Sequence, residues 1–115
     1  MELVLQISHS VSIKKAGRFK MQVAAIQMTL IAPDAHSLKD KRQIVRSVID
    51  QTRRRFNVSI SEVDALDLHQ RIMLGLAVVS TTAVHARTML DEIIRFVEDK
   101  AEIAGAECTR IETVL

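Results

Sequence analysis

The chain has 115 residues, enough for one domain with one modest hydrophobic core but not for two such domains. It contains no Trp or Tyr and three Phe, which argues against an aromatic platform that stacks single-stranded nucleic acid. The formal net charge is +2, but the bases are unevenly distributed along the chain. The single cysteine, Cys108, fits a reducing compartment, and no apolar run approaches the roughly 20 residues of a membrane span. We therefore expect a cytoplasmic protein without a membrane segment.

The first twenty residues differ in composition from the rest of the chain. They end in the run Lys14-Lys15-Ala16-Gly17-Arg18-Phe19-Lys20, which is basic and has no periodic apolar pattern. We expect residues 1–20 to form a mobile basic N-terminal extension and residues 21–115 to form the domain. The alternative is an additional edge strand at residues 3–7, where Leu, Val and Ile are concentrated.

The domain then alternates between strand and helix patterns. Residues 21–32 are apolar on both faces, which predicts a central strand that ends at Pro33. Ser37 is the expected N-cap of a helix over residues 37–55, and Asp40 completes an imperfect capping box. Residues 57–63 and 71–81 read as strands, and Thr81 or Thr82 begins a helix that runs to about residue 104. Gly105 suits the position after this helix, and residues 107–114 read as a short final strand.

This order, β-α-β-β-α-β, is that of the ferredoxin-like fold of the α+β class. Right-handed connections place both helices on one face of a four-stranded antiparallel sheet. The other face would carry apolar side chains from the first and third strands, which a monomer leaves exposed to water. We therefore expect the protein to be a homo-oligomer that associates through this open face.

Four short motifs resemble a known protein family. They are residues 35–42 (AHSLKDKR), 55–59 (RFNVS), 67–71 (DLHQR) and 74–80 (LGLAVVS). In this order they are similar to the YlxP-like family of small bacterial proteins, which carry a domain of unknown function. The resemblance covers about residues 21–115 and implies a ferredoxin-like fold. Members are commonly encoded beside transcription and translation factors, which implies a role linked to RNA or the ribosome, and the family offers no established catalytic residue.

The first helix carries the clearest functional signal. Residues 36–55 contain seven basic residues against Asp40 and Asp50. On a helical projection Leu38, Ile44, Val45, Val48, Ile49, Thr52 and Phe56 share the core face. Five basic residues stand beside that face and could track a phosphate backbone: Lys39, Arg42, Arg46, Arg53 and Arg54. The alternative is a solvated helix face whose charge Asp50 partly cancels by pairing with Arg46, Arg53 or Arg54.

Other chemistries have weaker support in the sequence. Glu62, Asp64, Asp67 and His69 lie close together but lack a regular metal-ligand spacing, and Asp67 could instead hydrogen-bond the turn backbone. No phosphate-binding glycine loop and no set of nucleophile, base and orienting group is recognisable. We expect no catalytic residue, no metal site and no cofactor.

Two hypotheses about function follow from these patterns. In the first, the protein is a small non-catalytic RNA- or ribosome-associated binding protein that contacts phosphates through Lys39, Arg42, Arg46, Arg53 and Arg54. In the second, it is a homo-oligomeric scaffold or regulatory module whose open sheet face binds a protein partner.

Overall fold

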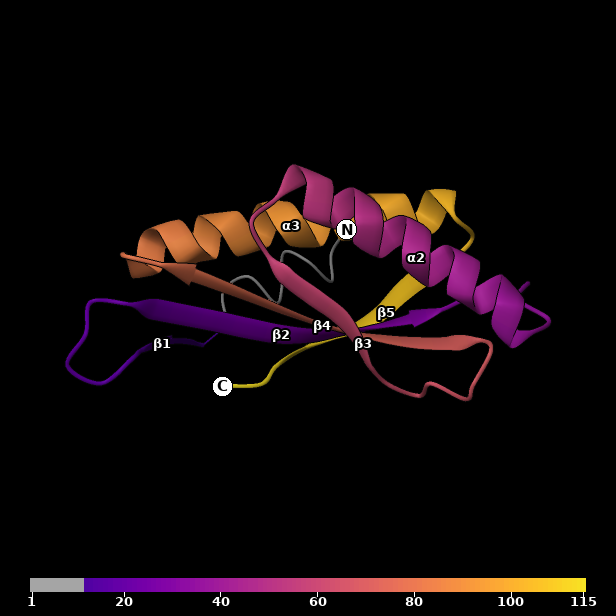
Figure 1. The fold of residues 1–115 in the computed structure, drawn as a ribbon, viewed down its shortest axis with the longest axis horizontal. Helices are drawn as coiled ribbons and strands as arrows, with labels where there is room; N and C mark the ends of the chain where they lie inside the picture. Colours follow the sequence, from indigo (N-terminus) through magenta and orange to yellow (C-terminus); the bar gives the residue numbers. More distant parts are fainter. Residues whose placement is uncertain (1–11) are drawn as a thin grey trace.

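The computed structural model describes residues 12–115, which form two helices and five strands (Figure 1). Their bounds are β1 Ile13–Lys15, β2 Gln22–Ile31, α2 Leu38–Arg55, β3 Ser59–Asp64, β4 Arg71–Ser80, α3 Ala83–Ile103 and β5 Glu107–Thr113. Both helices and the last four strands of this order agree with the elements predicted from the sequence to within about two residues, which is the usual uncertainty at element ends.

All strand pairs in the sheet are antiparallel, and β2 and β4 lie at its centre. The far side of β4 pairs with β3. The other side of β2 is shared, because β5 pairs along residues 26–31 and β1 along residues 22–24. Both helices cover one face of this sheet (Figure 1). The ferredoxin-like arrangement is confirmed, but the sheet has five strands rather than the four predicted.

The additional strand corrects part of the expected N-terminal extension. Ile13, Lys14 and Lys15 pair with Ala24, Val23 and Gln22 of β2, so these three residues belong to the sheet. A hydrogen bond of 3.3 Å from the Ser12 backbone amide to the side-chain Oγ1 of Thr113 ties the start of β1 to the end of β5. The expected mobility of residues 1–11 and the alternative strand at residues 3–7 lie outside the described residues.

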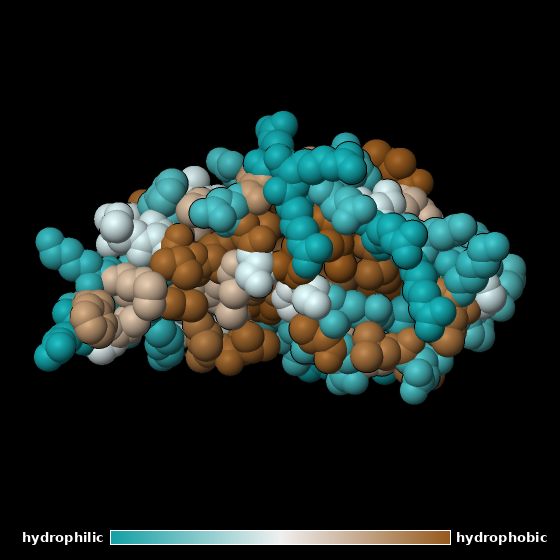
Figure 2. All heavy atoms as spheres, viewed as in Figure 1, coloured by the Kyte–Doolittle hydropathy of each residue, from teal (hydrophilic) through white to brown (hydrophobic). Residues whose placement is uncertain are grey.

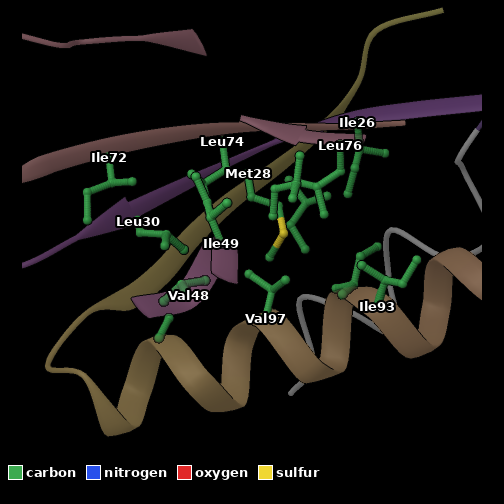
Figure 3. Packing of buried hydrophobic residues seen from close by; sticks show 14 of the residues in the cluster. Ile26, Met28, Leu30, Val48, Ile49, Ile72, Leu74, Leu76, Ile93 and Val97 are labelled. Atoms are coloured by element: carbon green, nitrogen blue, oxygen red, sulfur yellow. The ribbon is translucent and has the colours of Figure 1, made fainter. Parts of the chain in front are cut away.

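The core fills the space between the helix-covered face of the sheet and the two helices (Figure 3). Alternate residues of β2 and β4 point into it, as the two-residue period of a strand requires: Ala24, Ile26, Met28, Leu30, Ile72, Leu74, Leu76 and Val78. The helices contribute residues at a spacing of three or four, among them Val45, Val48, Ile49, Leu90, Ile93, Ile94 and Val97. Close packing of these branched side chains fixes the position of each helix on the sheet.

The helix ends follow the predicted capping chemistry. Ser37 Oγ accepts from the Asp40 amide at 3.1 Å, and Asp40 Oδ2 accepts in turn from the His36 amide at 2.9 Å. Thr82 Oγ1 accepts from the His85 amide at 3.1 Å and caps α3. Gly105 follows α3 with a φ of +94°, a left-handed conformation that favours glycine.

A glycine inside β4 lies where two strands approach each other closely. A Cβ atom built on Gly75 would stand 2.8 Å from Cγ1 of Val63, which is nearer than carbon atoms pack. The pairing of β3 with β4 is irregular at this point, between Glu62 and Asp64. Glycine at position 75 therefore allows the close approach of β3 and β4 at this irregularity.

The sheet face away from the helices is open to solvent. Hydrophobic residues reach the surface along the lower side of the molecule, away from the helices (Figure 2). Val79 is 56% exposed and Val63 is 51% exposed, while Ala25, Met73 and Ala77 are half-buried. The predicted open apolar face is therefore present in the chain that the structure describes.

Candidate nucleic-acid interface

The basic residues of α2 all lie outside the core. The five predicted residues are exposed: Lys39, Arg42, Arg46, Arg53 and Arg54. Val45, Val48 and Thr52 on the same helix are buried, so packing fixes which side of α2 faces solvent. Hydrophilic side chains follow α2 across the surface in Figure 2. We refer to Lys39, Arg42, Arg46, Arg53 and Arg54 as the basic stripe. At 1.5 Å of rise per residue it extends over roughly 20 Å.

Most charges of the basic stripe are not neutralised by a neighbouring acid. Among residues 12–115, Lys39, Arg42, Arg46 and Arg54 form no ion pair, and Asp50 forms none with Arg46, Arg53 or Arg54. The pairing of Asp50 with Arg46, Arg53 or Arg54 that the alternative included is not formed in the described part of the chain. These exposed cations are free to attract an anionic partner from solution.

Arg53 differs from the other members of the basic stripe. Its Nη2 donates to the carbonyl oxygen of Ile60 in β3 at 2.8 Å. Because β3 is an edge strand, this bond satisfies a backbone acceptor that no further strand covers. Arg53 therefore holds the C-terminal part of α2 against β3, and the other four residues present their charge without such a contact.

The most constrained cation of the helix was not predicted as part of any site. Lys41 is 1% exposed, and its ammonium group lies 2.7 Å from Glu62 Oε2. The same group donates to the carbonyl oxygens of Ala65 and Leu68, each at 2.7 Å. The Lys41 ammonium group therefore combines an ion pair with the Glu62 carboxylate and hydrogen bonds to backbone carbonyl oxygens of the loop after β3. Lys41 is therefore a structural residue that joins α2 to β3 and to the loop after it.

A sequence signal for Lys41 was available. At about 100° per residue, Lys41 falls between Val48 and Thr52 on the helical projection, at the centre of the core face. A lysine there predicts either a helix misassignment or a buried partner of opposite charge. Glu62, in an otherwise alternating strand, was that partner, but only the tertiary structure brings the two together.

The acidic turn does not assemble a metal site. Glu62 pairs with Lys41, while Asp64 Oδ1 accepts from the Ala65 amide at 2.7 Å. Asp64 therefore makes the turn contact that was expected of Asp67. Ala65 has a φ of 56°, a left-handed conformation uncommon for alanine, and its carbonyl oxygen is one acceptor of Lys41. Within residues 12–115 no group of His, Cys, Asp or Glu is arranged to hold a metal ion.

A hollow of about 520 Å³ lies at the C-terminal end of α3. Its lining includes four carboxylate side chains and a thiol: Glu98, Asp99, Glu102, Glu107 and Cys108. Burial raises the pKa of the Glu98 carboxyl, and the nearby Glu102 carboxylate raises it further. Burial also raises the pKa of the Cys108 thiol to about 11, so the thiol is protonated at neutral pH and is a poor nucleophile. The Cys108 thiol is therefore not an activated nucleophile.

The chain matches a family described as "Protein of unknown function (DUF503)" over residues 23–110. It is also 37% identical over 70 residues to the uncharacterized protein YlxP of Bacillus subtilis (strain 168), an overlap of 61% of this chain and 76% of that protein. The chain belongs to this family of proteins of unknown function. The resemblance seen in the sequence is thus confirmed.

Two solved structures are similar in fold. One is a de novo designed protein with a ferredoxin fold, at a TM-score of 0.56 and 19% identity, which covers 81% of this chain and 85% of the design. The other is a C-terminal segment of the alpha subunit of aIF2 from Pyrococcus abyssi, at a TM-score of 0.49 and 13% identity. The match covers 81% of this chain and about half of that segment, 51%. The likeness to the design supports the ferredoxin-like fold.

Neither described helix is long and apolar enough to cross a membrane.

We predict that Lys41→Met lowers the free energy of unfolding by about 3–5 kcal/mol, because it leaves the Glu62 carboxylate buried without its partner. Lys41→Met combined with Glu62→Met should destabilise less, since no charge is then left unpaired. Lys39→Met is the matched control on the exposed side and should change stability by less than about 0.5 kcal/mol. Urea unfolding followed by circular dichroism measures all three, and equal effects at positions 39 and 41 would contradict the role of Lys41.

We also predict that Cys108 reacts slowly with iodoacetamide. A rise of the pKa from 9.0 to about 11 lowers the thiolate fraction roughly 100-fold at pH 8, and the thiolate is the reacting form. Alkylation in the folded chain, measured by mass spectrometry, should therefore be at least roughly 100-fold slower than in urea and should accelerate about tenfold per pH unit up to pH 11. Because the folded-state pKa is raised, the contribution of Cys108 to stability should be present below pH 9 and lost as the pH rises through about 11. Equal alkylation rates would show that the thiol is accessible and unperturbed.

Proposed function

We propose that the protein is a non-catalytic RNA-binding protein, associated with RNA or the ribosome, that contacts phosphates through the basic stripe of α2. The observation that carries the proposal is the row of exposed cations on one helix, four of which have no acidic partner among residues 12–115. Arginine suits this role because its planar group donates two parallel hydrogen bonds to a phosphate.

The rigidity of the helix supports this proposal. Lys41 holds α2 near its start and Arg53 holds it near its end, and both bind groups of β3 or of the loop after it. Arg42 and Arg46 lie between these two contacts. Since the backbone beneath them is fixed, binding would cost only the ordering of their own side chains. The proposed contacts are to phosphates, so they would position RNA rather than read its sequence.

We predict that Arg42→Gln combined with Arg46→Gln weakens RNA binding for all sequences alike. With about four phosphate contacts, the logarithm of affinity plotted against the logarithm of salt concentration should have a slope near −3 for the parent chain. Two lost contacts should flatten this slope by about one to two units. Glutamine retains helix propensity, so the fold should persist. Filter binding of a labelled RNA at several salt concentrations gives the slope.

The matched control is Arg87→Gln combined with Arg95→Gln, which removes the same charge from exposed positions of α3. If both double variants lose the same affinity and slope, the effect reflects net charge and not the basic stripe. If the α2 double variant binds like the parent, the stripe is a solvated helix face.

A second candidate function, self-association through the open sheet face, has its own observation. From Val23 to Ile31 of β2 and from Met73 to Val79 of β4, the side chains on this face carry no charge. The flanking strands place charged residues on the same side of the sheet, at Lys14 of β1 and at Arg110 and Glu112 of β5. The uncharged centre does not repel an identical centre, and the small side chains of Ala25 and Ala77 allow two sheets to pack about 10 Å apart. The occupant we propose is a second copy of this chain, related by a twofold axis.

We predict that Val79→Asp shifts this dimer towards monomer, because it would bury an unpaired carboxylate in the interface. Val84→Asp is the matched control, since Val84 is also exposed but lies on α3. Light scattering at micromolar concentration should give a dimer mass for the parent and for Val84→Asp. A monomer mass for the parent would refute the dimer.

A further inference from the structure

We propose that the turn between β1 and β2 is a second RNA contact, in which Phe19 stacks on an unpaired base. This inference rests on the proposed function and deepens it, because it narrows the ligand to RNA with a single-stranded segment. We call residues 14–20 the basic turn. All of it precedes residues 23–110, over which the family matches, so the contact would add to what the shared domain does.

The basic turn extends beyond the end of the sheet. Lys15, Gln22 and Ser80 pair in one row across β1, β2 and β4, and β4 ends there. Residues 16–21 continue past this row as a turn, closed by a hydrogen bond of 2.9 Å from the Ala16 amide to the Met21 carbonyl. Gly17 has a φ of +58°, which a turn of this kind requires. Figure 1 shows this turn projecting at the left end of the molecule.

Phe19 is available for stacking because it is not used in the core. The other two phenylalanines, Phe56 and Phe96, pack edge to face with ring centroids 5.3 Å apart. Phe19 is 62% exposed, and the Arg18 guanidinium lies 5.3 Å from its ring centroid. A ring held beside a guanidinium offers a base both a stacking surface and a cation for the adjoining phosphate.

The charge around Phe19 is suited to a polyanion. Lys14, Lys15, Arg18 and Lys20 are all exposed, and residues 3–33 of the sequence contain no Asp or Glu. None of the four forms an ion pair within the described residues. The N-terminus of α3 lies at the same end of the molecule (Figure 1) and adds positive potential there.

These features favour RNA over an anionic membrane surface. The basic turn offers one aromatic ring among four cations, whereas a membrane contact gains its strength from a larger buried apolar area. The basic stripe on α2 also presents exposed arginines without acidic partners, so one kind of ligand would satisfy both surfaces. A membrane surface is therefore the competing outcome of the experiment.

The chain has no tryptophan, so Phe19→Trp places a single fluorescent ring at the tip. We expect an oligouridylate of about 12 nucleotides to quench this fluorescence by stacking. A duplex RNA of the same length should bind through phosphates and quench little. Ile103→Trp is the matched control, because Ile103 is 74% exposed on α3 at its opposite end, and its fluorescence should not change.

Two further variants test the contribution of stacking to affinity. Phe19→Ala and Phe19→Leu both remove the ring, and each should weaken oligouridylate binding by roughly 5- to 150-fold. Duplex binding should change little. Thermal unfolding should show an unchanged fold, since Phe19 lies in an exposed turn.

The outcomes separate this inference from the proposed function. The inference is overturned if oligouridylate does not quench the Trp at position 19 and Phe19→Ala binds with full affinity. The proposed function still stands in that case if Arg42→Gln/Arg46→Gln flattens the salt slope. A blue shift of the position-19 emission with vesicles of phosphatidylcholine and phosphatidylglycerol, but no response to oligouridylate, assigns the turn to a membrane and overturns the inference. If the parent chain binds neither the oligouridylate nor the duplex RNA, both this inference and the proposed function are overturned.

Discussion

The position of α2, and with it the basic stripe, depends on one buried ammonium group. Lys41 lies 2.7 Å from a carboxylate oxygen and from each of two backbone carbonyl oxygens, so its buried charge is both paired and hydrogen-bonded. Burying a charge is unfavourable unless it is paired and hydrogen-bonded, so this arrangement tolerates only a small displacement of the helix. Since Ala65 and Leu68 belong to the loop after β3, the same group also fixes the loop that connects β3 to β4.

The second contact of α2 with β3, from Arg53 to the Ile60 carbonyl, has a different consequence. An edge strand with free carbonyl groups can pair with a strand of another molecule, and a cation over that edge discourages such pairing. Arg53 was predicted as a phosphate ligand, yet its hydrogen bond to the Ile60 carbonyl also gives it a structural role. In the described chain, no such hydrogen bond is made by the other four residues of the basic stripe, which are Lys39, Arg42, Arg46 and Arg54. They are the residues from which a phosphate contact can be expected.

Local patterns were sufficient to predict most of the fold. Apolar residues on both faces of the strand identified β2, and Ser37 and Thr82 marked the starts of the helices because capping is a local interaction. The β1 strand was missed because three residues are too short for a periodic signal, and its stability comes from pairing with β2. The Lys41–Glu62 pair was missed because it joins residues 21 positions apart through a contact that only folding creates. The basic stripe was found because helical periodicity alone decides which residues share a face.

The basic stripe of α2 and the open sheet face do not compete with each other. The helices cover one face of the sheet and the apolar residues lie on the other (Figures 1 and 2), so a dimer through the open face would leave both copies of α2 at its outer surfaces. Each dimer would then carry two basic stripes on opposite outer surfaces. An RNA long enough to reach both would bind the second stripe at a raised effective concentration, whereas a short RNA would gain nothing. Self-association would therefore make the affinity rise once an RNA is long enough to reach both basic stripes. A monomer has one basic stripe, so its affinity would not rise at that length.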